Sequence, residues 1–215
     1  MSRKVVNKQE ARGVGDRLDL EPYHQMCEVL WYWRIDDFIR GLGQKEGGIL
    51  AFVRGLHFSA QLIYAIRDII SKKDLKANWG HLLDRAGEYC SRECDIIIHK
   101  GERNQWNGQQ RKDPVMDFKF VRQDKAIIVI SCKSYLRSGA VDKDYVRCLN
   151  PYCKKIWLFA ECCEPKHVKA IKQQAHDAGY QNFWYLYQWS RETTSRERNE
   201  TGWLDFVKKI RSLKA

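Results

Sequence analysis

Residues 126–133 read Ala-Ile-Ile-Val-Ile-Ser-Cys-Lys, the strongest β-strand pattern in the chain. Its run of β-branched and apolar residues predicts a strand buried on both faces. The run ends at Lys133, and a charge at the end of an apolar strand is costly unless it has a partner or a function. A second run, Asp95-Ile96-Ile97-Ile98, predicts another buried strand that begins with a carboxylate. The arrangement of these two strands decides the fold.

Helical and strand patterns alternate around this pair. Helices are expected over residues 21–40, 49–70, 142–150, 165–178 and 203–213, and further strands over 114–121, 156–160 and 183–187. After the long helix at 49–70 the order is three strands, helix, strand, helix, strand. This order is typical of an α/β fold with a mixed sheet covered by helices on both faces.

The domain organisation follows from where these patterns start and stop. Residues 1–20 are polar and contain two glycines, which favours a flexible basic arm. Residues 21–190 are expected to form a single α/β domain that includes an additional N-terminal helix. Residues 191–202 are polar and charged, so we expect residues 191–215 to form a linker and a C-terminal helix.

The charge of the chain favours a polyanionic partner. Its 215 residues include 38 Lys and Arg against 27 Asp and Glu, a net charge of +11, and nucleic acid is the first candidate partner. No apolar run is long enough to span a bilayer, and the polar N-terminus lacks the apolar core of a signal peptide. We therefore expect a cytoplasmic protein with no membrane partner.

The eight cysteines are expected to be reduced in that compartment. Zinc sites usually combine two short-spaced cysteine pairs, most often of the CxxC type. The pairs here are Cys90 with Cys94, Cys148 with Cys153, and the adjacent Cys162 and Cys163, none of which is CxxC. Zinc binding is thus a weak alternative, and the same holds for ligand roles of His81 and His99, which flank the second strand.

The chemistry of the chain is expected at Asp95 and Lys133. Side chains alternate along a strand, so Ser131 and Lys133 share a face, and a carboxylate on a neighbouring strand is the natural partner of the lysine. Phosphodiester hydrolysis uses this grouping, because a carboxylate can hold a divalent cation and a lysine can orient or deprotonate the attacking water. The backbone carbonyl of Cys132 is a further candidate metal ligand.

These residues resemble the PD-(D/E)XK nuclease superfamily. The motif residues are Ser91 to Ile98 and, after a loop, Ile128 to Ser134, and the element order matches across roughly residues 47–162. The resemblance implies a restriction-endonuclease-like fold, a metal-binding Asp95, a catalytic Lys133, and Mg²⁺ as the cofactor with Mn²⁺ as the alternative. It also implies a DNA endonuclease of a restriction or phage-defence system.

One position departs from the family pattern. Ser131 stands where the family carries its second acid, as in some restriction endonucleases that supply a carboxylate from the following helix. Asp144 is the expected metal ligand by this analogy, and Asp142, Glu88 and Glu46 remain open as alternatives. Double-stranded DNA is the expected substrate, and a homodimer would match its two-fold symmetry.

Two other functions are left open. Because of Ser131, the chain could be a catalytically inactive nucleic-acid-binding module on a nuclease-like fold. An aromatic run in the first predicted helix, residues 31–33, would suit a protein-interaction subunit. Separately, Trp106 lies within a basic loop and could contact nucleic acid.

Overall fold

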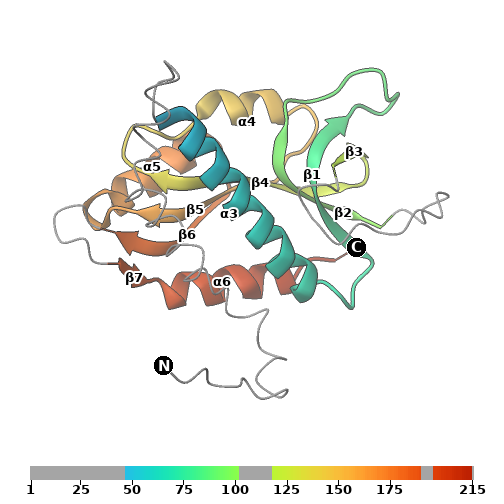
Figure 1. Cartoon of the computed structure of the whole chain (residues 1–215). Coiled ribbons are helices and arrows are strands. Elements are labelled where there is room, and N and C mark those ends of the chain that lie inside the picture. The colour runs from blue at the N-terminus through green and yellow to red at the C-terminus, as the bar shows by residue number, and fades with distance from the viewer. Residues whose placement is uncertain (1–46, 102–117, 190–195, 215) are drawn as a thin grey trace.

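The computed structural model describes residues 47–101, 118–189 and 196–214 (Figure 1). The predicted arm, the predicted first helix with its aromatic run, Glu46 and Trp106 lie outside these residues. Four helices are described, and they are α3 (Gly47–Ile69), α4 (Lys143–Leu149), α5 (Val168–Asp177) and α6 (Glu200–Arg211), with a 3₁₀ turn, η2 (Pro165–His167), before α5. None of the described helices combines the length and the apolar character needed to cross a bilayer.

The centre of the fold is one mixed sheet. Its strands are β1 (Leu75–Leu83), β2 (Cys94–Lys100), β3 (Lys119–Arg122), β4 (Ala126–Leu136), β5 (Ile156–Cys163), β6 (Asn182–Trp189) and β7 (Arg196–Arg198). The spatial order is β3-β1-β2-β4-β5-β6-β7. Strand β2 is antiparallel to both β1 and β4, whereas β4, β5 and β6 run parallel.

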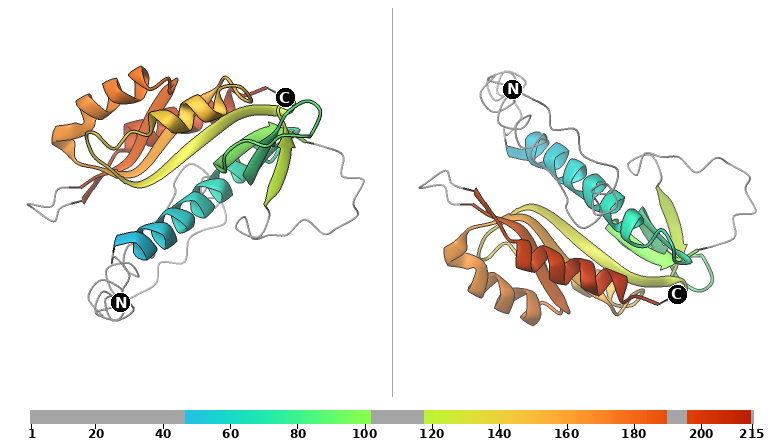
Figure 2. Two further views of the ribbon diagram at one scale, coloured as in Figure 1. Left: turned by 90° about the horizontal axis from the view of Figure 1, so that it is seen from above. Right: turned by 90° about the horizontal axis from the view of Figure 1, so that it is seen from below.

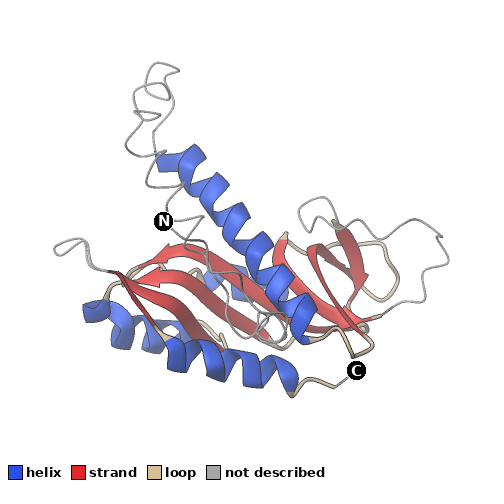
Figure 3. Ribbon diagram, turned by 60° about the horizontal axis from the view of Figure 1, so that its bottom comes forward, coloured by secondary structure: helices blue, strands red, loops and turns tan. Residues whose placement is uncertain are grey.

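Helices cover both faces of the sheet. Helices α3 and α6 pack on one face through Phe58, Trp203 and Phe206 among others, and Phe206 lies 4.6 Å, between ring centroids, from Phe159 of β5. Helices α4 and α5 pack on the other face through side chains such as Leu149 and Ile171. Figures 2 and 3 show α3 crossing the sheet on the side opposite α4 and α5. This three-layer arrangement confirms the predicted α/β fold class.

Local sequence signals set several of the helix ends. The Asp142 side chain accepts a hydrogen bond from the Tyr145 amide at 2.9 Å and caps α4, as expected for an aspartate at this position. Asn199 caps α6 in the same way through the Gly202 amide at 3.1 Å. Gly179 follows α5 with φ +95°, a left-handed conformation that glycine adopts without strain.

Two predictions of secondary structure were wrong. Strand β1 was not predicted, because its sequence, LKANWGHLL, is half polar and the strand is interrupted by a bulge between Asn78 and Gly80. Residues 196–202 were expected to belong to a linker, but they form β7 and the first turn of α6. The sheet therefore extends past the point where the polar sequence suggested that it would stop.

Candidate active site

Asp95 lies beside β4 because of the register between the two predicted strands. Ile96 pairs with Ile130, so the next position along the antiparallel ladder brings Asp95 opposite Ser131. Asp95 Oδ2 accepts a hydrogen bond from the Cys132 amide at 2.7 Å and lies 3.5 Å from Ser131 Oγ. The carboxylate thus closes the ladder at the point where regular pairing of β2 and β4 ends.

Lys133 lies on the same side of the sheet as Asp95 and Ser131. Side chains on a strand alternate between its two faces, so Val129, Ser131 and Lys133 of β4 share one face. Val129 and Ser131 are fully buried, and Val129 packs against α4 and α5. The positive charge of Lys133 interacts favourably with Asp95. Within the described part of the chain, Lys133 Nζ makes neither a hydrogen bond nor an ion pair. The structure therefore brings Asp95, Ser131 and Lys133 together and leaves the ammonium group available.

The surroundings of Asp95 act on its pKa in opposite directions. Burial of the carboxyl group raises the pKa above its ordinary value of 3.8 and is the largest effect. The Cys132 amide and the Lys133 charge lower the pKa and offset part of this rise. A buried carboxyl with a raised pKa and a nearby cation is typical of functional sites.

Glu93 is an acid near Asp95 that the sequence analysis missed. After burial, its negative charge is the main factor that raises the pKa of Asp95. Glu93 is exposed, and its Oε1 accepts a hydrogen bond of 2.8 Å from Trp79 Nε1. It immediately precedes β2, and no periodic pattern marks it. Only its position two residues before Asp95 could have pointed to it.

Two buried tyrosines adjoin the carboxylate from the α4 side. Burial raises the pKa of Tyr145 well above its ordinary value, and the Asp95 charge adds to the rise. Its Oη has no well-aligned hydrogen-bond partner among the described residues. Tyr180 Oη donates to the Asp142 carbonyl at 3.2 Å and also lies close to Ser131. Burial, then the charges of Asp142 and Asp95, raise the pKa of Tyr180, so both phenols stay protonated at neutral pH.

Arg92 is a half-exposed cation beside this cluster. Its guanidinium lies 3.5 Å from Asp142 Oδ2 and 5.7 Å from the centre of the Tyr145 ring, a cation–π geometry. Half of the Arg92 side chain, 52%, is exposed. A planar, fixed guanidinium of this kind can bind a phosphate group through paired hydrogen bonds.

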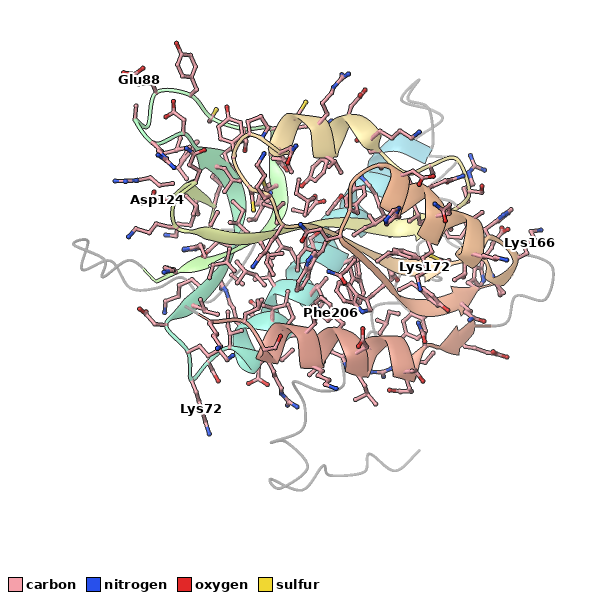
Figure 4. All side chains as sticks on the ribbon, turned by 180° about the vertical axis from the view of Figure 1, so that it is seen from behind. Lys72, Glu88, Asp124, Lys166, Lys172 and Phe206 are labelled. Atoms are coloured by element: carbon pink, nitrogen blue, oxygen red, sulfur yellow. The ribbon has the colours of Figure 1, made fainter. Side chains whose placement is uncertain are left out.

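The four acids considered from the sequence lie in different environments. The Asp144 side chain is 70% exposed and pairs with Arg147 at 3.1 Å. Asp142 caps α4 and pairs with Arg92. Glu88 lies in the exposed turn between β1 and β2, where Figure 4 shows it directed toward solvent. Glu46 precedes the described residues. Metal ligation by Asp144 and by the Cys132 carbonyl stays a prediction.

His81 and His99 have hydrogen-bond partners within the fold, and the described cysteines form no metal site. His99 uses both ring nitrogens, with the Lys100 carbonyl and Asn78 Oδ1 each at 2.9 Å. His81 donates from Nδ1 to the Ser91 carbonyl at 2.7 Å. The seven cysteines of the described residues are present as thiols, and within these ranges no three His, Cys, Asp or Glu side chains form a group that could hold a metal.

Comparison with known proteins identifies the fold. The sequence matches no protein-family model and no curated protein. Among solved structures, the chain aligns with NucC of P. aeruginosa in its cAAA-bound form at a TM-score of 0.51, covering 97% of this chain and 92% of that one at 9% identity. The fold resembles that of NucC. The cAAA-bound form of E. coli NucC aligns at a TM-score of 0.48 and 8% identity, covering 98% of this chain and 92% of that one. The apo form of E. coli NucC aligns at a TM-score of 0.44 and 8% identity, covering 73% of this chain and 85% of that one.

This likeness supports the predicted α/β fold with a mixed sheet flanked by helices. At such low identity it extends to the fold alone. The roles of Asp95, Ser131 and Lys133 therefore depend on the geometry of this chain.

Proposed function

We propose that this chain is a metal-dependent DNA endonuclease of the PD-(D/E)XK type, with Mg²⁺ as the cofactor and Mn²⁺ as a substitute. The proposal includes a cytoplasmic role in restriction or phage defence. One observation carries it: the half-buried Asp95 carboxylate and the Lys133 ammonium group, which has no ion pair among the described residues, share one side of the sheet where β2 and β4 separate. These are the two charges that phosphodiester hydrolysis requires.

The donor set near Asp95 suits magnesium better than zinc. Mg²⁺ commonly binds one or two carboxylates and completes its shell with water and substrate phosphate, whereas structural zinc needs four protein ligands. Asp95 and Glu93 provide two carboxylates within electrostatic range of each other. We propose these two as ligands, with the Cys132 carbonyl and Asp144 as the further candidates. When bound, the ion would polarise the phosphate and acidify a water molecule.

The chain's own residues would bind and orient the substrate around that ion. Lys133 would hydrogen-bond the attacking water and counter the negative charge that develops on the phosphate. Arg92, half-exposed and fixed by Asp142, would bind a phosphate of the DNA backbone. Ser131 would help to keep the Asp95 carboxylate in place through its hydroxyl group.

The net charge of +11 supports nucleic acid as the substrate, with double-stranded DNA as our first choice. Cutting both strands of a duplex calls for two active sites related by a two-fold axis, so we propose a homodimer.

Cleavage of plasmid DNA tests the proposal. Purified protein with Mg²⁺ should nick or linearise the plasmid, and Lys133→Ala should abolish cleavage while binding persists. Lys172→Ala is the matched control, because this lysine is exposed on α5 (Figure 4) and is not among the residues that form the candidate site. Absence of cleavage by the wild-type protein with either Mg²⁺ or Mn²⁺, at any protein concentration, would refute it.

Ser131 favours one alternative function. This side chain is fully buried in place of the second acid, as expected if catalysis had been lost and DNA binding kept. A binding module of this kind would show salt-sensitive DNA binding that is unchanged by Mg²⁺ and by Lys133→Ala.

A further inference from the structure

Four aromatic rings form a continuous cluster at the β3 edge of the sheet. Trp79 and His81 come from β1, and Phe118 and Phe120 come from β3 and the residue before it. Phe118 contacts Trp79, His81 and Phe120 edge-on, with centroids 5.2 to 5.4 Å apart. His81 stacks on Phe120 at 5.7 Å with an angle of 15° between the rings. We call these four residues the aromatic platform.

The register of β1 and β3 explains why the rings meet. The two strands are parallel, with His81 opposite Phe120 and Leu82 opposite Val121. Leu82 and Val121 are buried on the α4/α5 side, so the alternation places His81 and Phe120 on the other side of the sheet. The platform is therefore a consequence of strand pairing rather than an accidental contact of loops.

The platform is open to solvent. Phe120 is 61% exposed, one of few large apolar side chains so exposed in the described residues. Strand β3 stands at the edge of the sheet, and the helices drawn in Figure 1 lie over the strands beyond it. The other three rings are half-buried, and an exposed phenylalanine that continues such a cluster is costly in water and commonly marks a binding surface.

The platform lies on the face of the sheet opposite the candidate active site, and the residues just before β2 link the two. Trp79 Nε1 donates to Glu93 Oε1, and the Glu93 charge acts on Asp95. His81 donates from Nδ1 to Ser91, which immediately precedes Arg92. The stretch from Ser91 to Asp95 thus connects the rings on one side of it with the charged cluster on the other.

Charge around the platform favours a polyanion that carries flat, apolar rings. Lys119 and Arg122 are exposed on the same short strand as Phe120. Arg122 shares a face with Phe120, and its side chain is 53% exposed and donates two hydrogen bonds to Asp124, so a phosphate would bind there in competition with that carboxylate. Stacked rings flanked by cations are the usual means of binding single-stranded nucleic acid, where the rings stack on bases and the cations contact phosphates.

We propose that the aromatic platform stacks on an unpaired base of single-stranded nucleic acid and so forms a second contact with the substrate, on the face of the sheet opposite the Asp95 site. This inference rests on the proposed function and names a feature of the substrate that it requires, an unpaired base that can reach the edge of the sheet at β3. Base-paired DNA hides the faces of its bases, so the platform would select frayed, flipped or single-stranded positions.

Binding without metal tests the inference separately from cleavage. The anisotropy of a fluorescein-labelled oligothymidylate, measured in EDTA, should report binding by the wild-type protein. Phe120→Ala should raise the Kd about 5- to 150-fold, the range for loss of one base–aromatic stack. Binding of a blunt duplex should change little. Tyr89→Ala is the matched control, because Tyr89 is 68% exposed and outside the platform.

Three results would overturn the inference. They are failure of the wild-type protein to bind the oligonucleotide, equal affinity and stability of the Phe120→Ala and wild-type proteins, and equal affinity together with a lower melting temperature of Phe120→Ala. The last result would mean that the rings pack against another part of the protein. If platform-dependent binding is found but no DNA is cut under any conditions, the proposed function fails and the binding site remains.

Discussion

Replacing Asp95 with alanine or asparagine separates its two structural effects. Alanine removes the oxygen that accepts the Cys132 amide at 2.7 Å, and Cys132 is buried. A buried amide left without an acceptor costs about 1–3 kcal/mol of the free energy of unfolding. For a chain of this size, that loss corresponds to a melting temperature lower by about 2–12 °C. Asparagine keeps an oxygen in the same place, so Asp95→Asn should avoid this cost.

The pH dependence of the two proteins should then differ in a defined direction. Burial raises the pKa of Asp95 in the folded state above its ordinary value of 3.8. The folded protein therefore holds a proton that the unfolded chain releases, and the wild type loses stability as the pH rises from 3.8 through the folded pKa. Asparagine does not ionise. The stability of Asp95→Asn relative to the wild type should increase across this window and stay constant above it.

Urea unfolding of the three proteins without metal, from about pH 4 to pH 8, measures both effects. Equal destabilisation by alanine and asparagine would refute the role of the Cys132 hydrogen bond. A relative stability of Asp95→Asn that falls with increasing pH would show that the surroundings favour the charged form and that the pKa of Asp95 is lowered rather than raised. Neither Asp95 variant should cut DNA.

Three further predictions concern the metal, the substrate and the core. Glu93→Gln should raise the Mg²⁺ concentration needed for cleavage about 10- to 100-fold, whereas Glu88→Gln in the exposed turn should leave it unchanged; equal effects would exclude Glu93 as a ligand. Arg92→Gln should reduce the salt dependence of DNA binding by about one phosphate contact, and an unchanged slope of log Kd against log salt would contradict the contact. Phe206→Ala, which removes a ring that projects from α6 toward the sheet (Figure 4), should cost about 3–5 kcal/mol in urea unfolding, against less than about 0.5 kcal/mol for the 55% exposed Leu204. A small effect at Phe206 would mean that α6 is not part of the cooperative fold.

Much of the sheet could be predicted because each of its central strands contains an unbroken run of apolar residues. Strands β2, β4 and β5 are long runs of buried residues, and these runs predict strands in any arrangement that buries both faces. Strand β1 could not be found in this way, since it carries Asn78 and Gly80 and owes its place to pairing with β2 and β3. Strand β1 therefore became visible only in the tertiary structure.

The candidate site likewise contains residues that the sequence singles out and residues that it does not. Asp95 and Lys133 could be singled out because charges at the ends of apolar strands are conspicuous, and the order of the strands made them neighbours. Glu93, Tyr145 and Tyr180 carry no such mark. Tyr180 follows the turn after α5, and it meets Ser131 only because parallel strands place that turn beside β4.

The sequence by itself determined the class of fold, the central strands, and the pair of charges that defines the site, because alternation and hydrophobic runs are local properties of the chain. Only the tertiary structure decided that Oδ2 of Asp95 accepts the hydrogen bond of the Cys132 amide and that Glu93 is the acidic neighbour of Asp95. It also decided that four rings from β1 and the β3 segment form one surface. These features depend on strand register and on contacts between residues distant in sequence, which a local pattern does not encode.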